Sequence, residues 1–181
     1  GFVPIGPSVV SNAAAIAGSF NPTNFGYFGG GTGPKSTIDR VDYSNDTATA
    51  AAKGPLSAAT QYLAATGNSF FGYFGGGEPG PKSTVDRIDY SSDTGTTPSK
   101  GPLSAARRIL AATGNASFGY FAGGEPTVST VDRIDYSNDT ATAAPKGPLS
   151  DARYGAAATG NASFGYFAGG FSPGQSSTVD R

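Results

Sequence analysis

The chain has 181 residues, including 28 glycines and 13 prolines, and contains no Cys, His, Met or Trp. Without imidazole or thiolate ligands it cannot build a structural zinc, haem, copper or iron–sulfur site, or a Ser–His–Asp or Cys–His catalytic centre. Its formal net charge is −1, so no global field attracts nucleic acid or an anionic membrane, and we predict no nucleic-acid partner. No apolar run approaches the roughly 20 residues of a spanning helix, so we also predict no membrane insertion.

Four copies of one sequence unit occupy nearly the whole chain, with a step of 46 or 47 residues between their Gly-Tyr-Phe motifs. The recurring landmarks are Gly-Tyr-Phe at Gly26, Gly72, Gly119 and Gly165; Asp-Arg at Asp39, Asp86, Asp132 and Asp180; and Gly-Pro at Gly6, Gly54, Gly101 and Gly147. We therefore predict a single repeat domain over residues 1–181, with copies at approximately 6–53, 54–100, 101–146 and 147–181.

Within each copy, short segments with strand signals alternate with Gly, Pro, Asn, Asp and Ser. In the third copy we predict strands over residues 107–113, 117–122 and 129–136, then a weaker one over 141–144 that ends at Pro145. The strand over 129–136 carries apolar and polar residues on both faces, so both faces are expected to pack against neighbouring sheets. Ala-rich segments such as residues 57–66 also fit a helix, but their length of about ten residues favours strands.

Further positions recur in register with these strands. They are Arg107 and Arg153 before the first strand, the pairs Gly76-Gly77, Gly123-Gly124 and Gly169-Gly170 after the second, and Tyr43, Tyr90 and Tyr136 after the third. This arrangement resembles the kelch repeat, although small residues around Thr49, Thr96 and Thr142 replace its tryptophan. The resemblance implies an all-β fold, a β-propeller of four-stranded antiparallel blades. The near-identity of the copies and the phrase DYSNDTATA also resemble, more weakly, phage-encoded kelch-like repeat proteins.

The two ends of the chain are complementary in such a ring. The fourth copy lacks the IDYSNDTATA segment, whereas residues 1–5 (GFVPI) stand where the other copies have a fourth strand. We predict that residues 2–5 close the blade formed by residues 151–181, giving four blades without an open edge. Small residues at 13–15, 58–59, 64–65, 111–112 and 156–158 suit the narrow channel. The alternatives are a larger ring and a ring shared by two chains.

Several sequence patterns could indicate a ligand-binding site, and each also has an interpretation as a purely structural feature. The Asp-Arg-x-Asp strands could form a carboxylate ring for calcium or a sugar, but we favour a ladder of Arg–Asp contacts. Asp42, Asn45 and Asp46 lack the EF-hand spacing, so we predict no metal. No Gly-Lys-Ser/Thr motif follows the glycine runs at 29–31 and 75–77, so these are interpreted as tight turns. Aromatics that recur once per copy are expected in the core.

No set of residues suggests catalysis, because Glu78 and Glu125 are the only glutamates and both precede proline. We predict a non-catalytic propeller without a cofactor, acting as a structural or interaction module on an extracellular or virion surface. It would bind a protein or glycan partner and assemble with other virion or surface proteins. The alternative is a carbohydrate-binding propeller of lectin or adhesion type.

The loops at 31–35, 77–82, 125–128 and 171–175 break the symmetry of the copies. A specific site is therefore expected in these loops. The candidate ligand-facing residues are Glu78, Lys82, Glu125, Phe171 and Gln175.

Overall fold

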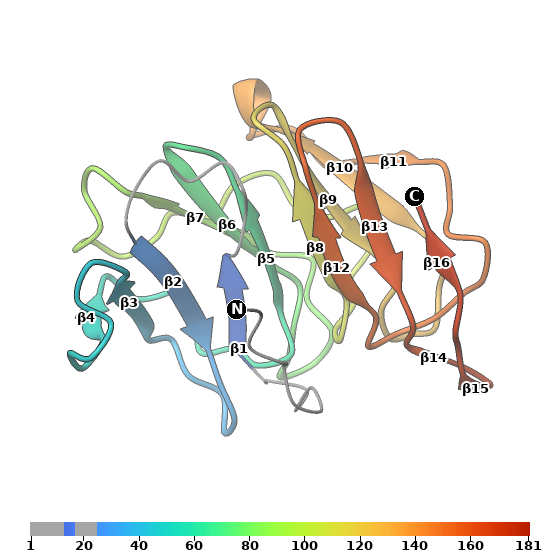
Figure 1. The fold of residues 1–181 in the computed structure, drawn as a ribbon, viewed down its shortest axis with the longest axis horizontal. Helices are drawn as coiled ribbons and strands as arrows, with labels where there is room; N and C mark the ends of the chain where they lie inside the picture. Colours follow the sequence, from blue (N-terminus) through green and yellow to red (C-terminus); the bar gives the residue numbers. More distant parts are fainter. Residues whose placement is uncertain (1–12, 17–24) are drawn as a thin grey trace.

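The computed structural model describes residues 13–16 and 25–181, which form an all-β molecule (Figure 1). Its strands are β1 (Ala13–Ile16), β2 (Phe25–Gly30), β3 (Ile38–Asp42), β4 (Ala51–Lys53), β5 (Ala64–Gly67), β6 (Phe71–Gly75), β7 (Val85–Asp89), β8 (Ala111–Gly114), β9 (Phe118–Ala122), β10 (Val131–Asp135), β11 (Ala144–Lys146), β12 (Ala157–Gly160), β13 (Gly165–Ala168), β14 (Phe171–Ser172), β15 (Gly174–Gln175) and β16 (Val179–Asp180). One short 3₁₀ turn, η1 (Tyr136–Asn138), follows β10.

Each copy forms one antiparallel sheet. Sheet 1 has the order β1-β2-β3-β4, sheet 2 β5-β6-β7, sheet 3 β8-β9-β10-β11 and sheet 4 β12-β13-β16, and β14 and β15 form a separate hairpin. The all-β prediction is confirmed. Four strands per copy occur in sheets 1 and 3, whereas sheets 2 and 4 have three strands among the described residues.

Sheet 2 lacks a full fourth strand because proline occupies its first position. Pro98 is the equivalent of Ala51, which pairs with Arg40 in sheet 1. The Pro98 carbonyl accepts a hydrogen bond from the Arg87 amide at 3.0 Å. Proline has no amide hydrogen to donate in return. The pairing is thereby reduced to a single bridge between Asp86 and Ser99.

Two boundaries predicted for the third copy differ from the structure. The first strand begins at Ala111, because Arg107 and Arg108 form single bridges to two different loops, at Lys82 and Glu125. The fourth strand is Ala144–Lys146 and includes Pro145 instead of ending at it. Proline is tolerated there because this is an edge strand, where one side of the backbone makes no ladder hydrogen bonds.

The sheets stand side by side in chain order, with their first strands innermost. β1 packs beside β5, β5 beside β8 and β8 beside β12 (Figure 1). Alanines dominate β5, β8 and β12, and their small side chains permit the close approach of neighbouring sheets. The closing strand predicted at residues 2–5 lies outside the described residues.

The core consists of layers between successive sheets. Phe74 of sheet 2 lies over Gly29 of sheet 1, and a Cβ added there would be 2.7 Å from its ring. Phe121 of sheet 3 lies over Gly75 in the same way, at 2.8 Å. Both phenylalanines are almost fully buried. Buried residues therefore occur on both faces of the middle sheets, as the mixed pattern of the third strand predicted.

Buried Arg–Asp pairs connect elements within a copy. The Arg107 guanidinium donates to the Asp132 carboxylate at 2.8 Å, with side chains 2% and 0% exposed. Arg153 and Asp180 form the equivalent pair in the fourth copy. In the second copy Thr60 replaces the arginine, and Asp86 instead accepts hydrogen bonds from Ser57. These contacts agree with the favoured interpretation of the aspartates as a structural ladder.

A second set of contacts joins each sheet to the next copy. The segment Asp-Tyr-Ser-Xaa-Asp-Thr after the third strand, here called the acidic turn, occupies residues 42–47, 89–94 and 135–140. Asp139 of the third copy accepts a hydrogen bond from the Tyr73 hydroxyl at 3.0 Å and lies 2.7 Å from Arg87 and 3.5 Å from Lys100. These groups of sheet 2 form what we call a socket.

Sheet 1 has the same socket for the second copy. Asp93 accepts from Tyr27 at 3.0 Å and lies 2.8 Å from Arg40 and 3.2 Å from Lys53. The tyrosines of these two acidic turns stack on the socket tyrosines: Tyr90 on Tyr27 at 4.9 Å and Tyr136 on Tyr73 at 4.8 Å between ring centres.

The buried tyrosines predict a loss of stability at alkaline pH. Burial raises the pKa of Tyr27 from 10.0 to about 12, and also raises the pKa values of Tyr73, Tyr90 and Tyr136. Above pH 10 the unfolded chain releases these protons while the folded chain retains them, so the free energy of unfolding should fall as pH rises through 10 to 12. Urea unfolding at several pH values, alongside tyrosinate absorbance, measures this. The expectation is wrong if all tyrosines ionise before any unfolding.

Candidate functional site

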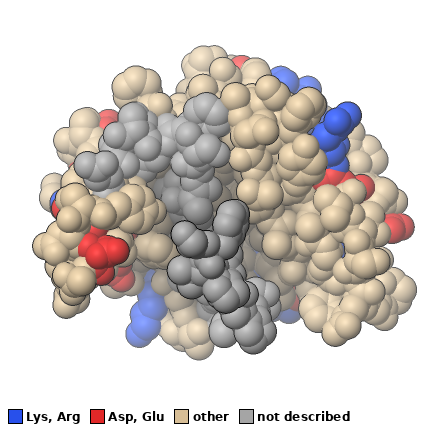
Figure 2. Space-filling view, in the orientation of Figure 1, with Lys and Arg blue, Asp and Glu red and all other residues tan. Residues whose placement is uncertain are grey.

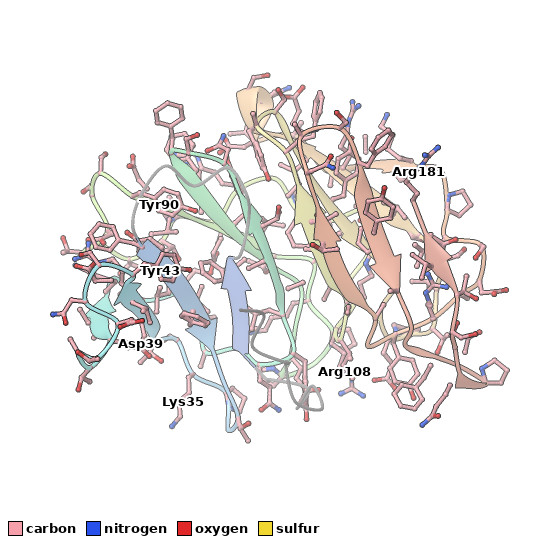
Figure 3. All side chains as sticks on the ribbon, viewed as in Figure 1. Lys35, Asp39, Tyr43, Tyr90, Arg108 and Arg181 are labelled. Carbon is pink, nitrogen blue, oxygen red and sulfur yellow. The ribbon has the colours of Figure 1, made fainter. Side chains whose placement is uncertain are left out.

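The symmetry-breaking loops lie together at one end of the sheets. In the second, third and fourth copies the segment before the first strand pairs with the loop after the second strand, through the bridges Gln61–Glu78, Arg108–Glu125 and Tyr154–Phe171. Arg108 and Lys35 mark this end in Figure 3, at the bottom of the view. We call these six paired residues and the loops that carry them the loop edge.

Glu78 and Glu125 come together through Arg108. The Arg108 Nε donates to Glu125 at 2.8 Å, its Nη1 donates to Glu78, and the Gln61 amide donates to Glu78 at 2.5 Å. The hydrogen bonds that Glu78 accepts from Gln61 and then from Arg108 lower its pKa, and those that Arg108 donates to Glu125 and then to Glu78 raise the pKa of Arg108. The Glu78 carboxyl is therefore ionised at neutral pH, which makes it a hydrogen-bond acceptor and a poor proton donor.

Phe171 and Gln175 lie at the sheet 4 end of the loop edge. Phe171 stacks on Tyr154, with 5.6 Å between ring centres, and is 43% exposed. Gln175 is opposite Phe171 in the β14–β15 hairpin. The structure thus separates these candidates into Glu78 and Glu125, in the loops of sheets 2 and 3, and Phe171 and Gln175, on the β14–β15 hairpin beside sheet 4.

Lys82 is directed differently from the other candidates. Its ammonium donates to the Ala59 carbonyl at 3.0 Å and to the Thr60 hydroxyl at 2.9 Å. These bonds join the loop after β6 to the segment that precedes β5. The contacts of Lys82 thus serve to hold the loop edge together.

The backbone of the loop edge has an unusual conformation in the second, third and fourth copies. Tyr62 and Ile109 have positive φ values of 58° and 53°, and Gly155 has 67° at the equivalent position. A β-branched residue such as Ile109 strongly disfavours this conformation, which costs about 1–3 kcal/mol. Backbone hydrogen bonds between copies accompany this conformation. The Ile109 amide donates to the Tyr62 carbonyl at 2.8 Å, and the Gly155 amide donates to the Ile109 carbonyl at 2.9 Å.

Sequence reasoning missed Gln61, Arg108 and Tyr154 as partners of the candidate loops. A signal was available, because glutamine, arginine and tyrosine occupy one equivalent position of an otherwise similar repeat. The left-handed residues Tyr62 and Ile109 gave no such signal, since neither type is typical of that conformation.

No protein-family model matches this chain, and no curated protein sequence matches it either. Within residues 13–16 and 25–181, no three His, Cys, Asp or Glu side chains are grouped so as to hold a metal ion. No helix in that described part is long and apolar enough to cross a membrane. On the face shown in Figure 2, charged side chains of both signs are scattered among uncharged ones.

Proposed function

We propose that the chain is a non-catalytic interaction module whose four copies are blades of a kelch-like β-propeller, and that the loop edge binds a protein partner. Its Ser-, Thr-, Asn- and Gly-rich loops suit an extracellular or virion surface, where it would assemble with other surface proteins. The side-by-side order of β1, β5, β8 and β12 supports the radial arrangement.

One observation carries the binding proposal. Three equivalent backbone bridges present three different side-chain pairs: an amide with a carboxylate, a guanidinium with a carboxylate, and two stacked aromatic rings. The two occupied sockets, by contrast, are structural contacts that repeat the same chemistry. A rigid scaffold with locally varied loops is the usual basis of specific recognition.

Site-directed photo-crosslinking tests the loop edge. A benzoyl-phenylalanine at Phe171 should crosslink a defined protein in an extract of the source material, whereas the same group at Phe70 should not. Phe70 is a matched control because it is 69% exposed and lies in the turn at the opposite end of sheet 2.

The purified partner then provides the quantitative measurement. Arg108→Ala should weaken its binding about tenfold or more, as expected for an arginine at the centre of an interface. Equal crosslinking from both positions, or unchanged affinity of the variant, would contradict the proposal.

The exposed aromatic pair favours a second function, carbohydrate binding. The Tyr154–Phe171 stack adjoins a hairpin amide at Gln175, and aromatic faces beside polar groups suit sugar rings. A glycan array should then give a signal that Phe171→Ala removes and Phe70→Ala retains. A signal that neither substitution changes would exclude this surface as the sugar site.

A further inference from the structure

The socket that holds an acidic turn on sheets 1 and 2 is repeated on sheet 3. Tyr120 and Arg133 are paired across β9 and β10, as Tyr73 and Arg87 are across β6 and β7. Lys146 in β11 is the equivalent of Lys100 in the second copy, at the same distance along the chain from Arg133 as Lys100 is from Arg87. In the described part of the chain none of these three forms an ion pair.

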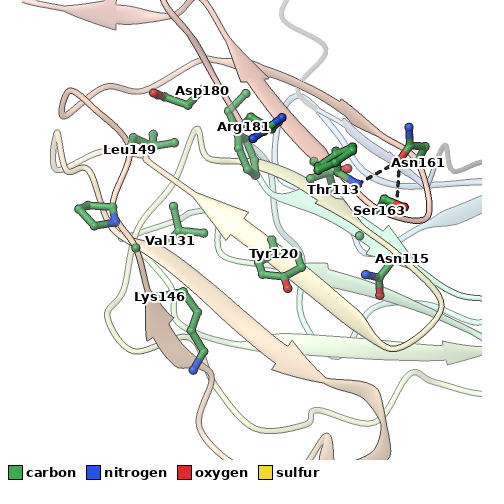
Figure 4. A pocket seen from close by; sticks show the side chains of 16 residues that line it. Thr113, Asn115, Tyr120, Val131, Lys146, Leu149, Asn161, Ser163, Asp180 and Arg181 are labelled. Carbon is green, nitrogen blue, oxygen red and sulfur yellow. Dashed lines mark hydrogen bonds between the residues drawn. The ribbon is translucent and has the colours of Figure 1, made fainter.

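A cavity of about 290 Å³ adjoins this third socket, between sheets 3 and 4 (Figure 4). Tyr120 and Lys146 line one side of it, with Gly147 and Pro148, and Asp180 and Arg181 line the other. Arg133 is paired in register with Tyr120, and its guanidinium lies 4.3 Å above the Phe118 ring, as the Arg87 guanidinium does above Phe71. The cationic part of the socket is therefore already in place.

The backbone of the third socket also matches the two occupied ones. The Gly54 amide donates to the backbone carbonyl of Asp93 and the Gly101 amide to that of Asp139, each at 2.8 Å. The carbonyls of Pro55 and Pro102 accept from Thr97 and Ala143, also at 2.8 Å. Gly147 and Pro148 are the equivalent residues, and both face the cavity.

Space at the glycine distinguishes the third socket from the others. A Cβ at Gly54 or Gly101 would lie 1.8 Å from a carbonyl oxygen of the next copy, that of Gly95 or Ala141. A Cβ at Gly147 would meet no atom of the described residues within 4 Å. The space that a bound acidic turn occupies next to Gly54 and Gly101 is therefore free of described atoms next to Gly147.

The tyrosine of an acidic turn also has a place to bind. Tyr136 stacks on Tyr73, and its hydroxyl lies 3.2 Å from the Thr66 hydroxyl. Thr113 and Tyr120, the equivalents of Thr66 and Tyr73, both line the cavity. The cavity therefore combines an aromatic face with a hydroxyl group at the matching position.

We propose that this cavity binds the acidic turn of a partner polypeptide, of sequence Ile-Asp-Tyr-Ser-Asn-Asp-Thr. The second aspartate would accept from Tyr120 and pair with Arg133 and Lys146. The tyrosine would stack on Tyr120, and the turn's backbone would bind the Gly147 amide and the Pro148 carbonyl. Positive charge opposite an acidic segment gives the electrostatic complementarity. This surface is separate from the loop edge, so the inference does not depend on the proposed function.

A synthetic peptide with the sequence of residues 134–144 is the probe. Titrated to millimolar concentration into the ¹⁵N-labelled whole chain, it should shift the amide resonances of Tyr120 and Gly147. A peptide with asparagine in place of the second aspartate should bind more weakly. Failure of the parent peptide to shift these resonances overturns the proposal.

Two protein variants separate binding from folding. Gly147→Ala should leave thermal unfolding unchanged but abolish peptide binding, because its methyl group would occupy the path of the turn. Lys146→Ala should weaken binding about fivefold through loss of an ion pair, whereas Lys35→Ala, on the loop edge, should not. Unchanged binding by Gly147→Ala overturns the proposal. If the whole chain dimerises and Asp46→Asn abolishes the dimer, the occupant of the cavity is a second copy of this chain. That result would contradict a separate partner polypeptide.

Discussion

Replacing Asp139 with alanine should lower the free energy of unfolding by about 3 kcal/mol or more. Asp139 is 8% exposed and is the common partner of the Tyr73 hydroxyl, Arg87 and Lys100. Its removal leaves two cationic groups and a hydroxyl without their acceptor in the layer between sheets 2 and 3. Loss of one member of a buried charge cluster costs far more than loss of a surface pair. Urea unfolding followed by circular dichroism measures the change.

The first copy provides a matched control. Asp46 occupies the same position of its acidic turn and is exposed. Asp46→Ala should therefore change stability by no more than about 0.5 kcal/mol. Similar effects of the two substitutions would show that Asp139 acts within its own turn and not by joining the sheets. Asp139→Asn, which keeps an acceptor but removes the charge, should fall between them.

Replacing Asp132 with alanine should have an effect of similar size, about 3–5 kcal/mol, for a different reason. The substitution leaves Arg107 as an unpaired guanidinium that is 2% exposed. Burial already lowers the pKa of Arg107, an effect that the Asp132 carboxylate opposes. Denaturant unfolding of the whole chain again gives the measurement.

The second copy suggests how to rescue this variant. Thr60 stands where the third copy has Arg107, and within the described residues Asp86 accepts hydrogen bonds from the Ser57 amide and from the hydroxyls of Ser57 and Ser99. Adding Arg107→Thr to Asp132→Ala should therefore recover part of the lost stability by removing the unpaired charge. A double variant less stable than Asp132→Ala alone would show that the arginine contributes mainly through packing.

Much of the fold could be predicted from the sequence because it depends on local patterns. The repeat of about 47 residues, the second strand of each copy and the structural use of the Asp-Arg-x-Asp aspartates all follow from motif spacing and alternation. The fourth strand was located less well. Its pairing in sheet 2 depends on one missing amide hydrogen at Pro98, and its position in sheet 3 on tolerance of Pro145 at an edge.

The candidate site was only half predicted. Glu78, Glu125 and Phe171 were selected because the copies differ in these loops, and the structure places all three on the loop edge. Their partners Gln61, Arg108 and Tyr154 are 17 residues away along the chain, in the segments before the innermost strands. No short-range pattern connects such positions, since only the return of the second strand brings them together.

By itself the sequence determined a repeating all-β chain without imidazole or thiol chemistry, because periodicity and composition are local properties. Only the tertiary structure decided which copy's charges are paired. Asp46, Asp93 and Asp139 occupy the same place in the repeat, yet Asp93 and Asp139 are held by the preceding sheet and Asp46 is exposed. The socket of Tyr120, Arg133 and Lys146 likewise has the same residues as the two occupied sockets, but within the described residues no aspartate pairs with it. Identical residues acquire different environments because each contact joins one copy to its neighbour, and the neighbour is a property of the assembled sheets.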